Sequence, residues 1–199
     1  MTESYSFRYV NIYIPKKLGG NVMIFRKAQA TEVDKVNEVI IQAAHRLKKL
    51  GSKQWSSMLN GEKLVEIKDR IQNGEVYIYQ DNNTTEIAGI VYVYDNQSEW
   101  DKQLWGNDNT ANTYYIHRLA IADKYCGKGM AINLLQELQE SVEPQAILRL
   151  DCLAEQAVLN NLYQRAGFSY LTRIKDHDTG EQVADFNLYE WQASKNSQY

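Results

Sequence analysis

Apolar side chains recur along the chain at two spacings, which predict helices alternating with strands. Spacings of three and four residues predict amphipathic helices over 31–50, 61–73, 127–140 and 155–167. Alternating or continuous apolar runs predict strands over 22–28, 75–80, 86–94, 113–122, 145–153, 168–176 and 183–191. Thr31 is the expected cap of the first helix, with Asp34 completing a capping box. The polar segment 95–112 is expected to be a long loop.

The order of these elements predicts a mixed sheet. The strand–helix–strand segment 113–153 requires a parallel pair, because its helix must cross over the sheet, whereas the hairpins 75–94 and 168–191 require antiparallel pairs. We therefore expect an α/β (α+β) fold in a single domain, with about seven strands flanked by about four helices. We expect this domain over residues 23–192, preceded by an extension (1–22) and followed by a tail (193–199).

Two questions about the extension stay open at this stage. Residues 5–14 alternate in part, so they fit either an edge strand or a loosely attached arm. Met23 is an alternative biological start of the chain.

Charge and hydrophobicity disfavour two classes of protein, those that bind nucleic acid and those that span a membrane. The 199 residues carry 22 basic and 25 acidic side chains, and the net charge of −3 disfavours binding to nucleic acid through global charge. We expect no membrane span, because no apolar run approaches 18 residues. The N-terminus lacks a signal-peptide pattern, and the two cysteines lack metal-ligand spacing. A cytoplasmic protein with reduced thiols and no metal is therefore expected.

The segment 119–135 carries the most informative pattern. An apolar strand runs into a short loop with Gly127 and Gly129, and a helix follows. Such a loop exposes backbone N–H groups at the positive end of a helix, where they bind phosphate oxygens. Lys124 and Lys128 add positive charge. Taken alone, the pattern fits a plain turn into a helix equally well.

Two blocks of sequence resemble the GNAT superfamily of acetyl-CoA-dependent N-acetyltransferases. The family's phosphate loop reads [Q/R]-x-x-G-x-[G/A] after an L-x-V strand, and here Leu119–Ile121 leads to Lys124–Gly129, with Lys in place of Gln or Arg. The second block ends in Tyr163-Gln-Arg-Ala-Gly-Phe168, which fits the family's Y-x-x-x-G-F pattern. Gln156 stands where the family often has Asn, and Asn160 is a further candidate for that contact.

The resemblance implies direct transfer of an acetyl group from acetyl-CoA to a primary amine of a small molecule or peptide. In the family, the loop backbone (here 126–131) holds the phosphates and the strand (here 119–121) pairs with the pantetheine arm. The implied cosubstrate-binding residues are Leu119, Ala120, Ile121, Lys124, Cys126, Gly127, Lys128, Gly129, Met130, Ala131, Gln156, Asn160 and Tyr163.

Two residues are candidates for proton transfer. Tyr163 is the implied acid, because a tyrosine keeps its proton at neutral pH and can donate it to the leaving thiolate. His117 is either the base or a structural residue of its strand. Its case as a base rests on strand alternation, which places it on the same face as Leu119 and Ile121 unless a bulge near Ala120 interrupts the strand.

Three further alternatives stay open from the sequence. An acyl-CoA-binding module of the same fold without turnover competes with the enzyme. A homodimer through an exposed edge strand is compatible with the chain. The aromatic residues Trp55, Trp100, Trp105 and Tyr114 are candidates to shape the acceptor pocket, and the tryptophans equally fit packing within the protein.

Overall fold

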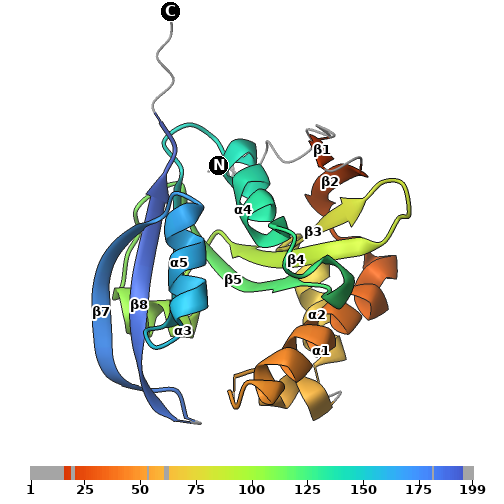
Figure 1. Cartoon of the computed structure of the whole chain (residues 1–199). Coiled ribbons are helices and arrows are strands. Elements are labelled where there is room, and N and C mark those ends of the chain that lie inside the picture. The colour runs from red at the N-terminus through yellow and green to blue at the C-terminus, as the bar shows by residue number, and fades with distance from the viewer. Residues whose placement is uncertain (1–15, 19–20, 53, 61–62, 181, 195–199) are drawn as a thin grey trace, which may run out of the picture. The chain divides into compact units, whose positions relative to one another are not determined.

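The computed structural model describes residues 16–18, 21–52, 54–60, 63–180 and 182–194 (Figure 1). These residues form two compact units. The first unit contains the described residues up to Val93 together with His117–Leu134, and the second contains Tyr94–Ile116 and the described residues from Leu135 onward. Strand β5 (Thr113–Ile121) and helix α4 (Met130–Ser141) contribute residues to both units.

The first unit is an antiparallel meander with two amphipathic helices. Its strands are β1 (Lys16–Leu18), β2 (Asn21–Lys27), β3 (Val76–Asp81) and β4 (Ile87–Tyr94), each antiparallel to the next. The end of β5 lies beside β4, since the N–H of Ala122 donates to the carbonyl of Ala88 (2.9 Å).

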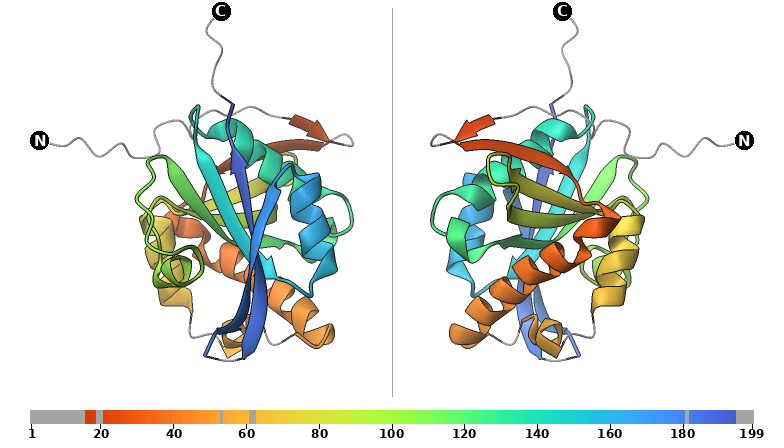
Figure 2. Two further views of the ribbon diagram at one scale, coloured as in Figure 1. Left: turned by 90° about the vertical axis from the view of Figure 1, so that its left-hand side faces the viewer. Right: turned by 90° about the vertical axis from the view of Figure 1, so that its right-hand side faces the viewer.

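The helices of this unit are α1 (Val33–Lys49) and α2 (Leu64–Gln72), with short 3-10 turns η1 (Ala30–Glu32), η2 (Ser56–Asn60) and η3 (Asp123–Tyr125). The two α-helices contact each other (Figure 2). Val36, Ile40 and Ile67 are completely buried, as the apolar spacing of both helices predicts.

The second unit combines parallel and antiparallel strands. Strand β6 (Ile147–Leu153) runs parallel to the start of β5, and β8 (Val183–Gln192) lies between β6 and β7 (Ser169–Asp178), antiparallel to both. Helix α5 (Ala157–Arg165) contacts β7, which forms a long hairpin with β8 (Figure 2). The parallel β5–β6 pair and the two flanking hairpins confirm the expected mixed α/β fold.

A helix occupies the segment expected to be a loop. Helix α3 (Glu99–Trp105) begins at Ser98, whose hydroxyl accepts from the N–H of Asp101 (3.2 Å) while the Asp101 carboxylate accepts from the N–H of Ser98 (2.8 Å). Its Leu104 packs in a small core against β6 and β8. The described residues thus hold eight strands and five α-helices, against about seven and four predicted.

Two details at the start of the chain also differ from the prediction. The cap of the first helical segment is not built by Thr31 and Asp34: the Glu32 carboxylate accepts from the N–H of Gln29 (2.9 Å) and from the Arg26 guanidinium (2.7 Å). Strand β2 begins at Asn21, inside the segment assigned to the extension. The candidate edge strand 5–14 lies outside the described residues.

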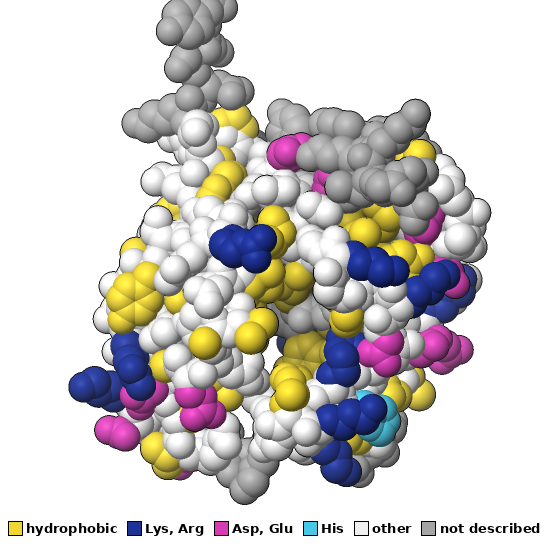
Figure 3. All heavy atoms as spheres, in the orientation of Figure 1, with side chains coloured by type: hydrophobic (Ala, Val, Ile, Leu, Met, Phe, Trp, Pro, Cys, Tyr) yellow, Lys and Arg dark blue, Asp and Glu magenta, His cyan; other side chains and the backbone are white. Residues whose placement is uncertain are grey.

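The distribution of surface charge and the length of the helices are relevant to binding of nucleic acid and membranes. Lysine and arginine side chains are interspersed with aspartate and glutamate on the face shown in Figure 3. Within the described residues, no helix is both long enough and apolar enough to cross a membrane.

Candidate functional site

The glycine loop of the first unit has the geometry expected of an anion-binding turn. Gly127 and Gly129 both adopt a φ of 74°, in the left-handed region that favours glycine. A Cβ atom at either position would meet nothing within 4 Å, so the space beside the loop is open. Helix α4 begins at the next residue, Met130, which places the loop at the positive end of a helix.

Side chains from distant segments hold this loop in place. Tyr125 is buried, and its hydroxyl bonds the carboxylates of Glu86 (2.9 Å) and Asp81 (3.3 Å) on the β3–β4 hairpin. Arg46 of α1 donates to the carboxylate of Asp123. These contacts link residues 39 to 77 positions apart, and no local pattern in the sequence pointed to them.

Helix α1 supplies two further contacts at the end of β5. The N–H of Asp123 donates to Oε1 of Gln42 (2.8 Å), and Arg46 also donates to the carbonyl of Ile121 (2.5 Å). The first helix therefore fixes both the end of the strand and the start of the loop.

The two lysines of the loop differ in their partners. Lys124 pairs with Glu86, and this hydrogen bond raises the pKa of Lys124 above its ordinary value. Lys128 is exposed and lies over the Tyr125 ring at 5.8 Å, and among the described residues no carboxylate pairs with it. Lys128 is therefore the more available cation for an anionic ligand. The exposed Cys126 points its thiol at the carbonyl of Ala122 (3.5 Å).

The strand before the loop approaches β4 closely. A Cβ at Gly89 would lie 2.6 Å from Cδ1 of Ile121, 3.0 Å from Leu134 and 3.1 Å from the carbonyl of Ala120. A side chain at this position would displace Ile121 and Leu134 and crowd the Ala120 carbonyl, so glycine allows β4 and β5 to lie this close together.

An interruption in β5 corrects one expectation about His117. Arg118 adopts a left-handed φ of 50°, so the extended repeat stops between His117 and Leu119. The common face expected for Tyr115, His117, Leu119 and Ile121 required an uninterrupted strand and does not hold. The half-exposed His117 remains next to the interruption.

Tyr163 lies on α5 in the second unit and is buried. Its ring contacts those of Tyr189 (centroids 5.9 Å apart) and Phe168 (6.4 Å). Burial, and to a lesser degree the neighbouring Cys152, raises the pKa of Tyr163 well above its ordinary value. The hydroxyl therefore stays protonated at neutral pH, and the raised pKa makes it a weaker proton donor than an exposed tyrosine.

Asn160, one turn earlier on α5, forms hydrogen bonds that connect this helix to the residues before it and to β8. Its Nδ2 donates to the carbonyls of Gln156 (2.8 Å) and Leu153 (3.1 Å). Its Oδ1 accepts from Nδ2 of Asn187 and from the hydroxyl of Tyr189, both at 2.6 Å. These bonds use both the nitrogen and the oxygen of the side-chain amide. Within this structure, Asn160 therefore bonds protein groups rather than presenting its amide to a cosubstrate.

The tryptophans of α3 pack within the second unit. Nε1 of Trp100 donates to the carboxylate of Asp151 (3.1 Å), and the Arg149 guanidinium lies 4.9 Å from the centre of the Trp105 ring. Both tryptophans also pack against the small core of β6 and β8. For these two residues, packing within the protein is therefore the interpretation that fits.

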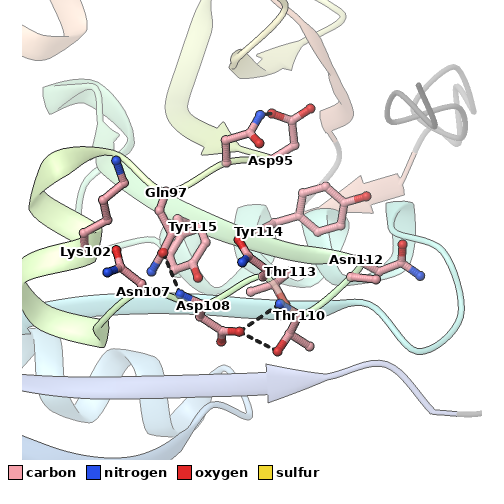
Figure 4. A pocket seen from close by; sticks show the side chains of 13 residues that line it. Asp95, Gln97, Lys102, Asn107, Asp108, Thr110, Asn112, Thr113, Tyr114 and Tyr115 are labelled. Carbon is pink, nitrogen blue, oxygen red and sulfur yellow. Dashed lines mark hydrogen bonds between the residues drawn. The ribbon is translucent and has the colours of Figure 1, made fainter. Parts of the chain in front are cut away.

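A polar cavity of about 660 Å³ lies near the start of β5 (Figure 4). Its loop satisfies many of its own polar groups: the Asp108 carboxylate accepts from the hydroxyl (2.6 Å) and N–H (2.8 Å) of Thr110, and Gln97 accepts from the N–H of Asp108 (2.9 Å). The bonds from Thr110 and from Arg149 lower the pKa of Asp108 to about 2. Most of its lining residues belong to the polar segment 95–112, and Tyr114 also lines it.

The site residues predicted from the sequence thus form two groups. Leu119–Ala131 belong to the first unit, and Gln156, Asn160 and Tyr163 belong to the second.

Comparison with known proteins decides the family. A family model described as an acetyltransferase (GNAT) domain matches residues 43–179. The chain belongs to the GNAT acetyltransferases. This family membership makes the protein an acyltransferase, and it accounts for both the glycine loop and the mixed sheet.

Relatives of this GNAT protein extend over most of its length. An uncharacterized N-acetyltransferase of Bacillus subtilis, YesJ, is 28% identical over 161 residues, which cover 80% of this chain and 84% of YesJ. A GNAT acetyltransferase structure from Listeria monocytogenes is 29% identical, with a TM-score of 0.68 over 90% of this chain and 99% of that one.

A more distant structure carries a ligand. The ribosomal L7/L12 α-N-protein acetyltransferase RimL, solved in complex with coenzyme A, is 16% identical, with a TM-score of 0.64 over 87% of this chain and 96% of that one. At this level of identity the likeness concerns the fold alone.

Proposed function

We propose that this protein transfers an acetyl group from acetyl-CoA to a primary amine of a small molecule or a peptide. The observation that carries the proposal is the loop before α4, where two left-handed glycines lie beside open space. Such a loop suits the phosphates of coenzyme A, because its N–H groups point outward at the positive end of a helix. The bound coenzyme A of RimL supports the choice of ligand.

In this proposal the backbone binds most of the cosubstrate. The N–H of Cys126 donates to the carbonyl of Asp123 (3.2 Å), so the phosphates are held by the N–H groups of residues 127–131, which include those of Met130 and Ala131. Lys128 adds a positive charge. Residues 119–121 pair with the pantetheine arm in the manner of an added strand. A backbone N–H near Leu119 polarises the thioester carbonyl, in the manner of an oxyanion hole.

The reaction needs two proton transfers. The neutral amine attacks the carbonyl carbon, a C–N bond forms and the C–S bond breaks, and the electron pair leaves with sulfur. Tyr163 donates its phenolic proton to this thiolate, because a tyrosine keeps its proton at neutral pH and can pass it to a neighbouring thiolate. His117, half-exposed next to the interruption in β5, is proposed to take the proton that the amine loses, directly or through a water, because an imidazole nitrogen can accept a proton.

Two measurements test this function. Acetyl-CoA at micromolar concentration should raise the melting temperature, because a ligand that binds only the folded state stabilises it. A panel of amines, polyamines, amino acids and N-terminal peptides should then show thiol release with at least one acceptor. No thermal shift with acetyl-CoA, propionyl-CoA or succinyl-CoA would refute the proposal.

A further inference from the structure

Arg118 has a backbone conformation that an arginine rarely adopts. Its φ of 50° lies in the left-handed region, in the middle of a strand whose other residues are extended. For a side chain with a Cβ this conformation is strained, and it persists only where the surrounding structure holds it. The contacts of the Arg118 side chain are therefore informative.

The side chain of Arg118 is held by helix α2 and strand β4. Its Nη2 donates to Oε1 of Glu66 (2.6 Å), and the guanidinium carbon lies 5.2 Å from the centre of the Tyr92 ring. The side chain is only 18% exposed. Its Nη1 is buried, and among the described residues no group accepts a hydrogen bond from it. The protein thus keeps the guanidinium in this position although one donor stays unpaired.

Glu66 is engaged on both of its oxygens. Oε1 accepts from Arg118, and Oε2 lies 3.1 Å from Nζ of Lys63. Although burial alone would raise the pKa of Glu66, the charge of Arg118 and the bond from Lys63 outweigh it and lower that pKa. The carboxylate is therefore ionised at neutral pH. Each carboxylate oxygen thus has one cationic partner, Arg118 for Oε1 and Lys63 for Oε2.

The conformation of Arg118 sets the direction of the next peptide group. In an extended strand successive N–H groups point to opposite edges, and one left-handed residue changes the direction of the N–H that follows it. That N–H belongs to Leu119, the group which the proposed function uses to polarise the thioester.

We propose that Arg118 and Glu66 are positioning residues, whose ion pair holds the left-handed backbone at Arg118 and thereby aims the Leu119 N–H at the thioester carbonyl. The inference rests on the proposed function. In this inference, Glu66 of α2 influences the reacting carbonyl through its contact with the Arg118 side chain of β5.

The test measures the polarisation of the thioester directly and needs no acceptor. Acetyl-CoA labelled with ¹³C at the carbonyl is bound to the protein, and the carbonyl stretching band is recorded by infrared difference spectroscopy. In the unmodified protein the band should shift to lower frequency on binding. In Glu66→Gln and Arg118→Lys, the charge-assisted hydrogen bond between the two side chains is weakened or lost, so more than half of this shift should be lost.

Glu32→Gln is the matched control. Glu32 also pairs with a single arginine, Arg26 (2.7 Å), at the start of α1. This variant should lose stability and keep the full band shift. Arg118→Gly supplies an independent variant, because glycine adopts a positive φ without strain: it should fold, yet lose the shift, since nothing then holds the peptide group.

Turnover gives a second readout. With any acceptor found active in the amine panel, kcat of Glu66→Gln should fall about tenfold, less than the loss of a whole oxyanion donor. The acetyl-CoA dissociation constant should change little, because the phosphate loop is untouched. A full band shift in folded Glu66→Gln, Arg118→Lys and Arg118→Gly would overturn the inference. A failure of the unmodified protein to bind acetyl-CoA would instead refute the proposed function.

Discussion

The glycine loop of the first unit and helix α5 of the second unit are built on opposite principles. In the loop the groups proposed to bind are backbone N–H groups, and side chains such as Tyr125 and Arg46 only hold the backbone. On α5 the proposed chemistry belongs to one side chain, Tyr163, and a neighbouring side chain, Asn160, fastens the helix. Acetyl-CoA binding by the loop should therefore be sensitive to substitutions that change the backbone conformation. The contribution of α5 to the reaction should be sensitive to the removal of single side-chain atoms.

The largest effect is expected from removing one oxygen atom. Tyr163→Phe should lower kcat about 100-fold, because the leaving thiolate loses its proton donor. The acetyl-CoA affinity, measured by calorimetry, should stay unchanged. Tyr77→Phe, at another buried tyrosine, is the control and should keep its kcat. An unchanged kcat in Tyr163→Phe would remove the proposed acid and, with it, the contrast between the two regions.

Next in size is a change of backbone conformation. Gly129→Val should weaken acetyl-CoA binding about 30-fold, because the left-handed conformation costs a side chain about 2 kcal/mol. The control is Gly51→Val at the end of α1, where φ is 78° and the space is also open. This variant should lose stability but keep its affinity. Equal affinities in the two variants would show that the shape of the loop is not what binds.

The third prediction concerns stability alone. Asn160→Ala should lower the free energy of unfolding by about 2–3 kcal/mol, because several partly buried hydrogen bonds lose their common partner. Asn161→Ala, at the exposed neighbouring position, should change it by less than about 0.5 kcal/mol. Denaturant titration measures both. A stable Asn160→Ala variant that no longer binds acetyl-CoA would restore the cosubstrate contact that the resemblance implied.

The smallest effect separates the two lysines of the loop. Lys128→Ala should weaken acetyl-CoA binding about threefold at low salt, and the difference should shrink as salt screens the charge. Lys124→Ala should leave the affinity nearly unchanged, because Glu86 already pairs with this lysine. A larger loss in Lys124→Ala would mean that the lysine leaves Glu86 when the ligand binds.

The prediction succeeded where the determining pattern is local. The amphipathic spacing of α1 and α2 and the crossover between β5 and β6 follow from segments of ten to twenty residues, and the structure has them. Helix α3 was missed because it is short and lies in a polar segment, although Ser98 and Asp101 form a capping box that marked its start. The interruption at Arg118 carries no glycine or proline, so no local signal announces it.

The sequence by itself determined the order of the elements, the left-handed loop of Gly127 and Gly129, and the setting of Tyr163, because each depends on neighbouring residues and on backbone sterics. Only the tertiary structure decided which charged groups are available. Lys124 pairs with Glu86, which lies 38 positions away in the sequence, and Arg118 pairs with Glu66, which lies 52 positions away. Such partners are chosen by the packing of strands and helices, which the spacing of residues along the chain does not specify.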